Sequence, residues 1–236
     1  MNYRYSRSSD AAAVQGDYGL RSYMARVYNY MAAGLGITGA VSYFVYNVPS
    51  LLYTVHTSPL RYLFMLAPLA LVLMFSFRIH KMSLSAAQGC FWAYASLMGV
   101  SLSYLFVLYS GESITRVFFI TAIMFLSMSI WGHTTKRDLT EFGSFLFMGL
   151  VGLVIASLVN LFMHSSMLHF VTSVVGVLVF TGLTAYDTQK IKSAYYYGSG
   201  SSAEALGKQA VYGALTLYLD FINIFISLLH IMGERK

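Results

Sequence analysis

Two aspartates interrupt the apolar C-terminal part of this 236-residue sequence. Asp187 lies in the run GLTAYDTQKIK at residues 182–192, and Asp220 lies in GALTLYLDFIN at residues 213–223. A charged side chain at the centre of a membrane helix costs roughly 2.5–3.5 kcal/mol on insertion scales, so such residues usually serve a function. The two aspartates are therefore the first candidates for chemistry.

Two carboxylates on neighbouring helices suit two kinds of chemistry. Their oxygens can bind calcium, and a close pair would share a proton because like charges resist ionising together. Such a pair would respond to both cation and pH, as a gated cation pathway requires. A proton-sharing pair can also activate water, as in aspartic proteases. Tyr186-Asp187 matches one motif of presenilin-type intramembrane proteases, but LYLD at 217–220 lacks the glycines of the other, so this alternative is the weaker one.

Asp220 belongs to a stripe of polar residues in the last apolar run. The stripe recurs at steps of three or four residues, which corresponds to one face of a helix. Its members are Gln209, Gly213, Thr216, Asp220, Asn223, Ser227 and His230. A lipid-exposed helix would not keep such a face, so we expect the last helix to lie centrally, with the stripe on a cavity or pore. Thr216, Asn223 and Ser227 are candidate pore-lining residues, although interhelical hydrogen bonding is an alternative role for Thr216 and Ser227.

Asp187 has its own polar neighbours. Thr184 precedes it by three residues on the same helix face and joins the pore-lining candidates. Arg78 ends the second apolar run near the same membrane boundary, so an ion pair between Arg78 and Asp187 is a candidate pH sensor. Arg78 could instead extend to lipid phosphates. Asp187 could likewise pair with Lys190 or Lys192 at the headgroups.

Composition places these residues in a polytopic membrane protein of the all-α class. The chain is 57% hydrophobic and 10% charged, whereas soluble domains carry about 25% charged residues. Its apolar runs are each near the ~20 residues needed to cross a bilayer, where only helices satisfy their own backbone groups. They fall at about 27–48, 61–79, 84–109, 114–132, 144–163, 167–188 and 209–231. We therefore predict a polar segment at 1–26, a seven-helix transmembrane domain at 27–232 and a short tail at 233–236.

The distribution of basic residues predicts the orientation. With a cytoplasmic N-terminus, the inner segments hold 11 of the 15 Lys and Arg residues and the outer segments hold 4, which satisfies the positive-inside rule. A re-entrant last run would return the C-terminus to the inside and shift the division to 13 against 2. The net charge of +6 is thus explained by the membrane topology, and nucleic acid is not an expected partner.

Other features of the sequence bear on its function class and its helix contacts. The sequence has no H-E-x-x-H zinc motif and no G-x-S-x-G elbow, so no enzymatic activity is predicted. The six histidines are scattered and are assigned to packing. The last run has no lysine for a retinal Schiff base. Gly36 with Ala40 and Gly152 with Ala156 have small-xxx-small spacing, which predicts helix contacts.

Three runs strongly resemble the Bax inhibitor-1 family, and its bacterial inner-membrane members most closely. They are GHTTKRDLTEFGSFLFMGLVGLVIASLVNLF at 132–162, GVLVFTGLTAYDTQKIK at 176–192 and GALTLYLDFIN at 213–223. The resemblance covers roughly residues 20–233.

The resemblance implies seven helices, with the last surrounded by the other six, and a pH-sensitive calcium leak across the cytoplasmic membrane. Asp187 and Asp220 match the family's proton-sharing aspartates, and in this chain they are also the candidate calcium ligands. Arg78 matches the arginine of the second helix that opposes one of these aspartates in the family. The expected partners are the lipid bilayer and calcium as the permeant ion, with no resident cofactor. Some bacterial relatives resemble modulators of a membrane-bound ATP-dependent protease, so a non-conducting regulator is a further alternative.

Overall fold

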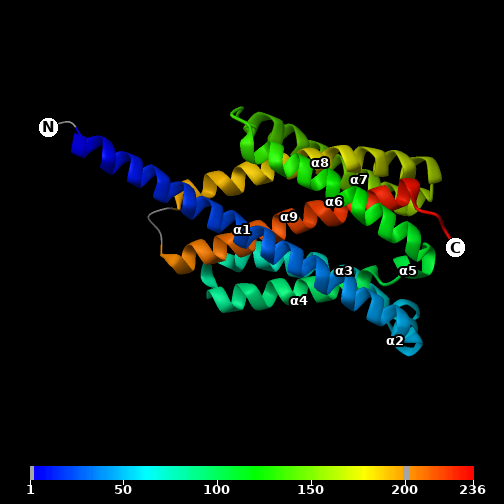
Figure 1. Ribbon diagram of the computed structural model, residues 1–236. Coiled ribbons are helices and arrows are strands. Elements are labelled where there is room, and N and C mark those ends of the chain that lie inside the picture. The colour runs from blue at the N-terminus through cyan, green and yellow to red at the C-terminus, as the bar shows by residue number, and fades with distance from the viewer. Residues whose placement is uncertain (1–2, 199–201) are drawn as a thin grey trace.

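The computed structural model describes residues 3–198 and 202–236, with the backbone alone at residues 3–17, 60, 65 and 80. The described chain is a bundle of helices connected by short segments (Figure 1). The elements are α1 (Tyr3–Asn47), α2 (Pro49–Thr57), α3 (Leu60–Arg78), η1 (Ile79–Lys81), α4 (Leu84–Leu102), α5 (Leu105–Leu108), α6 (Gly111–Thr134), α7 (Thr140–Met163), α8 (Ser166–Tyr197) and α9 (Ala203–Met232).

The membrane-spanning helices agree with the predicted apolar runs. Within the described ranges, six helices are long and apolar enough to cross a bilayer, and α1 with α2 supplies a seventh span if that bent pair is counted as one. The chain turns by 101° between α1 and α2. Pro49 opens α2, and the residue before a proline is disfavoured in a helix, which is why Val48 is extended and α1 ends there. The all-α, polytopic fold class is confirmed.

One predicted boundary differs from the structure. The polar segment and the first span are not separated at residue 26, because α1 runs unbroken from Tyr3 to Asn47. Leu20, Tyr23 and Met24, from the segment predicted to be polar, are buried. Gly19 and Tyr23 contact Tyr195 on α8, so tertiary packing stabilises this part of α1 as a helix. The possibility of a re-entrant last run is also resolved, because α9 is an unbroken helix of 30 residues.

The last helix occupies the centre of the bundle, as predicted. Figure 1 shows α9 running between α6, α7 and α8 on one side and α3 and α4 on the other. Half of the residues in the most apolar stretch of α9 are buried, whereas the buried share of the corresponding stretch is 6% in α7 and 12% in α3. It packs directly on α1, α4, α6 and α8, while α3 packs mainly on α4 and α7 mainly on α8. The family resemblance implies that the other six helices surround the last one, and four of them supply most of its contacts.

The glycines that allow close helix contacts are not the ones that the sequence spacing indicated. Gly36 and Gly152 have open space where a side chain would begin, so the predicted small-xxx-small contacts are wrong. Instead, Gly132 on α6 lies against the backbone of Ala185 on α8, and Gly213 on α9 lies against Ile191. Small residues serve a membrane interface only where another helix approaches them, and spacing alone does not reveal that.

A cavity with two buried carboxylates

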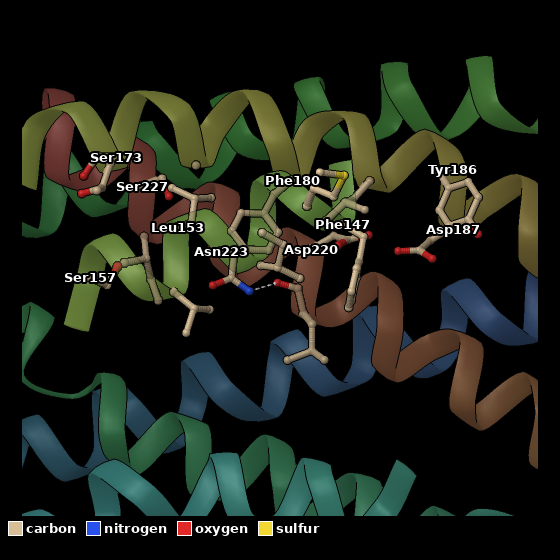
Figure 2. Close-up of a pocket in the computed structure, with 18 of the residues that line it drawn as sticks. Phe147, Leu153, Ser157, Ser173, Phe180, Tyr186, Asp187, Asp220, Asn223 and Ser227 are labelled. Atoms are coloured by element: carbon tan, nitrogen blue, oxygen red, sulfur yellow. Dashed lines mark hydrogen bonds between the residues drawn. The ribbon is translucent and has the colours of Figure 1, made fainter. Parts of the chain in front are cut away.

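The two aspartates line one cavity, of about 1060 Å³, between α7, α8 and α9. Figure 2 shows Asp187 and Asp220 toward the same end of this cavity, with Tyr186 beside Asp187. Asp220 lies in the middle of α9 and is only 4% exposed, whereas Asp187 is half-buried near the C-terminal part of α8. The structure therefore brings the two predicted carboxylates into one site.

Two close glycine contacts fix the relative register of α8 and α9. Gly213 packs on Ile191, and Gly176 packs on Ser227 further along the same antiparallel pair. These contacts place Asp187 on α8 level with the residues just after Thr216 on α9. Along the helix axis, Asp187 is therefore offset from Asp220 by about one helical turn, or ~5 Å. The two carboxyl groups nevertheless reach each other, because a side-chain hydrogen bond joins Asp187 and Asp220 and the charge of Asp187 acts on Asp220.

Asp220 is incompletely paired. Its Oδ2 atom is buried and has no hydrogen-bond partner among the described residues. A polar atom left unpaired in an apolar environment is costly, and an unpaired carboxylate is far more so. A proton, a cation or water in the adjoining cavity would relieve that cost. The site therefore favours the binding of one of these three species next to Asp220.

Lysines surround Asp187 without neutralising it directly. Lys190 lies one turn away and its charge acts on Asp187, but no ion pair joins them within the described chain. The Lys190 ammonium instead lies 5.7 Å from the centre of the Tyr186 ring. Lys192 donates to the carbonyl of His133 at 2.8 Å. The alternative in which Asp187 serves as a headgroup-level partner for these lysines therefore has no direct contact to support it.

The polar stripe of α9 faces the same cavity along much of its length. Thr216, Asn223 and Ser227 line it, as the sequence predicts. The Asn223 amide donates to the carbonyl of Leu219 in its own helix at 2.8 Å, the bond drawn in Figure 2. Thr184 is the exception among the pore-lining candidates. It is fully buried away from the cavity lining, and its hydroxyl donates to Phe180 on the same helix.

Arg78 does not join the two aspartates. It is an exposed residue at the end of α3 and makes no ion pair with any described residue. Because α3 packs mainly on α4 while Asp187 lies on α8, the bundle separates their helices. The pairing of Arg78 with Asp187 is therefore absent from this structure. Sequence placed both residues near one boundary but could not show that they lie on different sides of the bundle.

The opposite end of the cavity contains a pair that the sequence analysis missed. His169 on α8 and His230 on α9 both line it, and their ring centres are 4.4 Å apart. In the sequence the six histidines are scattered, and packing is their expected role. His230 ends the polar stripe, and an antiparallel α8–α9 hairpin places the start of α8 beside the end of α9. An antiparallel pairing of the last two apolar runs would therefore have predicted that His169 and His230 lie close together.

The cavity does not contain a complete calcium site. Within the described part of the chain, no group of three or more His, Cys, Asp or Glu side chains could hold a metal ion. Calcium takes six to eight oxygen ligands. The two carboxylates could supply only part of such a ligand set.

The segments that carried the sequence resemblance contact one another directly. Gly132 packs on Ala185, and Lys192 bonds to His133. The Gln189 side chain accepts from the backbone N–H of Leu139 at 2.9 Å, and it donates to the carbonyl of Arg137 at 2.8 Å. The loop between α6 and α7 is thus attached to α8 within a few residues of Asp187.

The fold and the cavity define a polytopic α-helical membrane protein with paired carboxylates between its last helices. A model of the family described as "Inhibitor of apoptosis-promoting Bax1" matches residues 20–236. The chain belongs to this family, the Bax inhibitor-1 family.

Several bacterial proteins are similar over nearly their whole length. The chain is 43% identical over 234 residues to the inner membrane protein YbhL of Escherichia coli, covering 99% of each chain. It is 48% identical over 220 residues to an uncharacterized protein of Rickettsia prowazekii, covering 93% of this chain and 92% of the relative. An uncharacterized membrane protein of Streptococcus pyogenes is 40% identical over 226 residues, covering 94% and 96% respectively.

Proposed function

We propose that this protein conducts calcium passively across the cytoplasmic membrane, with a pH sensitivity set by Asp187 and Asp220. The observation that carries the proposal is the buried, incompletely paired Asp220 carboxylate, one turn from Asp187 in a shared cavity. Two acidic groups joined by a hydrogen bond attract a divalent cation when both are ionised and share a proton when only one is.

The orientation follows from the basic residues. The 11-to-4 division of Lys and Arg favours a cytoplasmic N-terminus, and YbhL is named as an inner membrane protein. With that orientation Asp187 lies nearer the cytoplasm than Asp220. A calcium ion would meet Asp187 first from inside, while from outside it would pass His230, Ser227 and Asn223 along α9.

The pH response follows from the carboxylates without a contribution from Arg78. At higher pH both aspartates ionise, attract the cation and repel each other. At lower pH a shared proton removes one charge, weakens cation binding and lets α8 and α9 approach more closely at this level. Flux should therefore rise with pH over the range in which the pair ionises.

Calcium uptake into proteoliposomes that contain an internal calcium indicator tests the proposal. Wild type should show uptake that increases with pH, and Asp187→Asn and Asp220→Asn should each reduce or flatten that dependence. Glu112→Gln is the matched control, because Glu112 is an exposed carboxylate on α6 outside the cavity. Unchanged uptake and unchanged pH dependence in both aspartate variants would refute the gating role of the pair. Absence of uptake by wild type would refute conduction and leave a non-conducting regulator as the better proposal.

A further inference from the structure

Two imidazoles meet at the end of the cavity that is remote from the aspartates. His169 lies near the start of α8 and His230 near the end of α9. Their rings meet edge to face, with centres 4.4 Å apart and planes inclined at 61°. Both side chains line the cavity that also contains Asp187 and Asp220.

The imidazole nitrogens of this pair have no hydrogen-bond partner among the described residues. The bonds at His169 involve its backbone carbonyl, which accepts from Thr172 and Ser173. A neutral imidazole offers one N–H and one lone pair, and these groups need partners when they are half-buried. Their partners must therefore come from the cavity.

We propose that His169 and His230 form a binding site for a divalent transition-metal ion of the zinc type. Imidazole nitrogen suits zinc, copper and nickel, whereas carboxylate oxygen suits calcium and magnesium. The two ends of one cavity would therefore prefer different cations. No third His, Cys, Asp or Glu completes a cluster here within the described chain. Water from the cavity therefore supplies the remaining ligands, in the way that water fills the open position of catalytic zinc sites.

The site is separate from the aspartate pair. His230 follows Asp220 by ten residues on α9, which is ~15 Å along a helix. A single ion cannot bridge that span. The charge of Arg235 acts on His230 and opposes a bound cation. Binding should therefore be moderate and reversible, and it should tighten when that positive charge is removed.

Zinc titration of the purified full-length protein, followed by calorimetry at neutral pH, tests the proposal. Wild type should bind one zinc ion saturably. His169→Asn and His230→Asn should each weaken binding by at least about tenfold, because even changes outside the ligand shell cost 10- to 100-fold in metal affinity. Equal affinity in wild type and both variants would overturn the proposal.

The matched control is His164→Asn. His164 lies five residues before His169, is exposed and does not line the cavity. Its φ of 50° is left-handed, a conformation that asparagine tolerates. This variant should bind zinc as wild type does, and an equal loss of affinity would overturn the assignment. Arg235→Gln should tighten binding, which a purely packing role for the histidines does not predict.

A spectroscopic measurement decides the question if the histidine variants fail to fold. Zinc K-edge absorption of wild type loaded with one equivalent should show imidazole nitrogens at about 2.0–2.1 Å. The same sample should show no sulfur, since Cys90 lies outside this cavity. A shell of oxygen ligands alone would overturn the site.

Discussion

The contact between α6 and α8 at Gly132 provides a quantitative test of the helix packing around the site. A Cβ atom on Gly132 would lie 2.2 Å from the carbonyl oxygen of Ala185 and 2.8 Å from its Cα. Ordinary van der Waals contact begins near 3.4 Å, and the atoms approached belong to a helix backbone that cannot rotate away. Gly132→Ala therefore forces the two helices apart locally by roughly 1 Å, a gap that forfeits much of the dispersion energy of the atoms facing it.

The expected cost follows from this displacement. Overpacking a close contact costs typically 1–3 kcal/mol. Membrane helices associate mainly by such packing and by hydrogen bonds, so α6 and α8 have no hydrophobic term to compensate for the loss. Ala185 precedes Asp187 by two residues, so the same displacement changes the position of Asp187 relative to Asp220. Gly132→Ala should therefore alter calcium flux as well as stability.

Gly152→Ala is the matched control. Gly152 lies within α7 and has open space at its Cβ position. Alanine there gains helix propensity of up to about 1 kcal/mol over glycine and clashes with nothing. Unfolding of the detergent-solubilised protein in sodium dodecyl sulfate, followed by circular dichroism, should rank Gly152→Ala at or above wild type. Gly132→Ala should fall below Gly152→Ala by at least about 1 kcal/mol. Equal stability of the two variants would show that α6 and α8 are not in backbone contact.

Three further predictions test contacts around the site. Tyr218→Phe removes the 2.7 Å bond to Thr38 and should cost about 0.6 kcal/mol in the same unfolding assay, since Thr38 keeps two carbonyl partners; a cost above about 2 kcal/mol would exceed the measured range for such bonds. Hydrogen bonds from the Thr140 side chain and backbone lower the pKa of Asp138, so its stabilisation is present above the unfolded pKa and is lost as pH falls through the folded pKa. Asp138→Asn should thus be less stable than wild type at neutral pH and should converge with it in acid; a difference that grew in acid would contradict this sign. Gln189→Ala frees the loop before α7 from α8 and should speed amide hydrogen exchange at that loop, whereas unchanged exchange would show that other contacts hold it.

The location of the carboxylate pair was predictable because it depends on local patterns. Apolar runs in a bilayer must be helices, and seven polar positions at helical spacing on one of those runs require a buried or hydrated face. A central α9 and a cavity face for Asp220 follow from these patterns, and in the structure α9 is the most buried of the six single-helix spans in the described ranges and Asp220 lines the cavity. Thr184 departed from the pattern because its hydroxyl can satisfy itself on its own helix.

The sequence by itself determined the class, the spans and the pair of acidic residues, because hydrophobicity and helical period act along one chain. Only the tertiary structure decided what lies across the interfaces: the one-turn offset of the aspartates, the separation of Arg78 from them and the meeting of His169 with His230. These depend on how far one helix slides and rotates against another. That is set by a few close contacts, such as Gly213 on Ile191 and Gly132 on Ala185. A glycine in sequence looks the same whether a helix approaches it or not, and the exposed Gly36 and Gly152 show why spacing could not tell them apart.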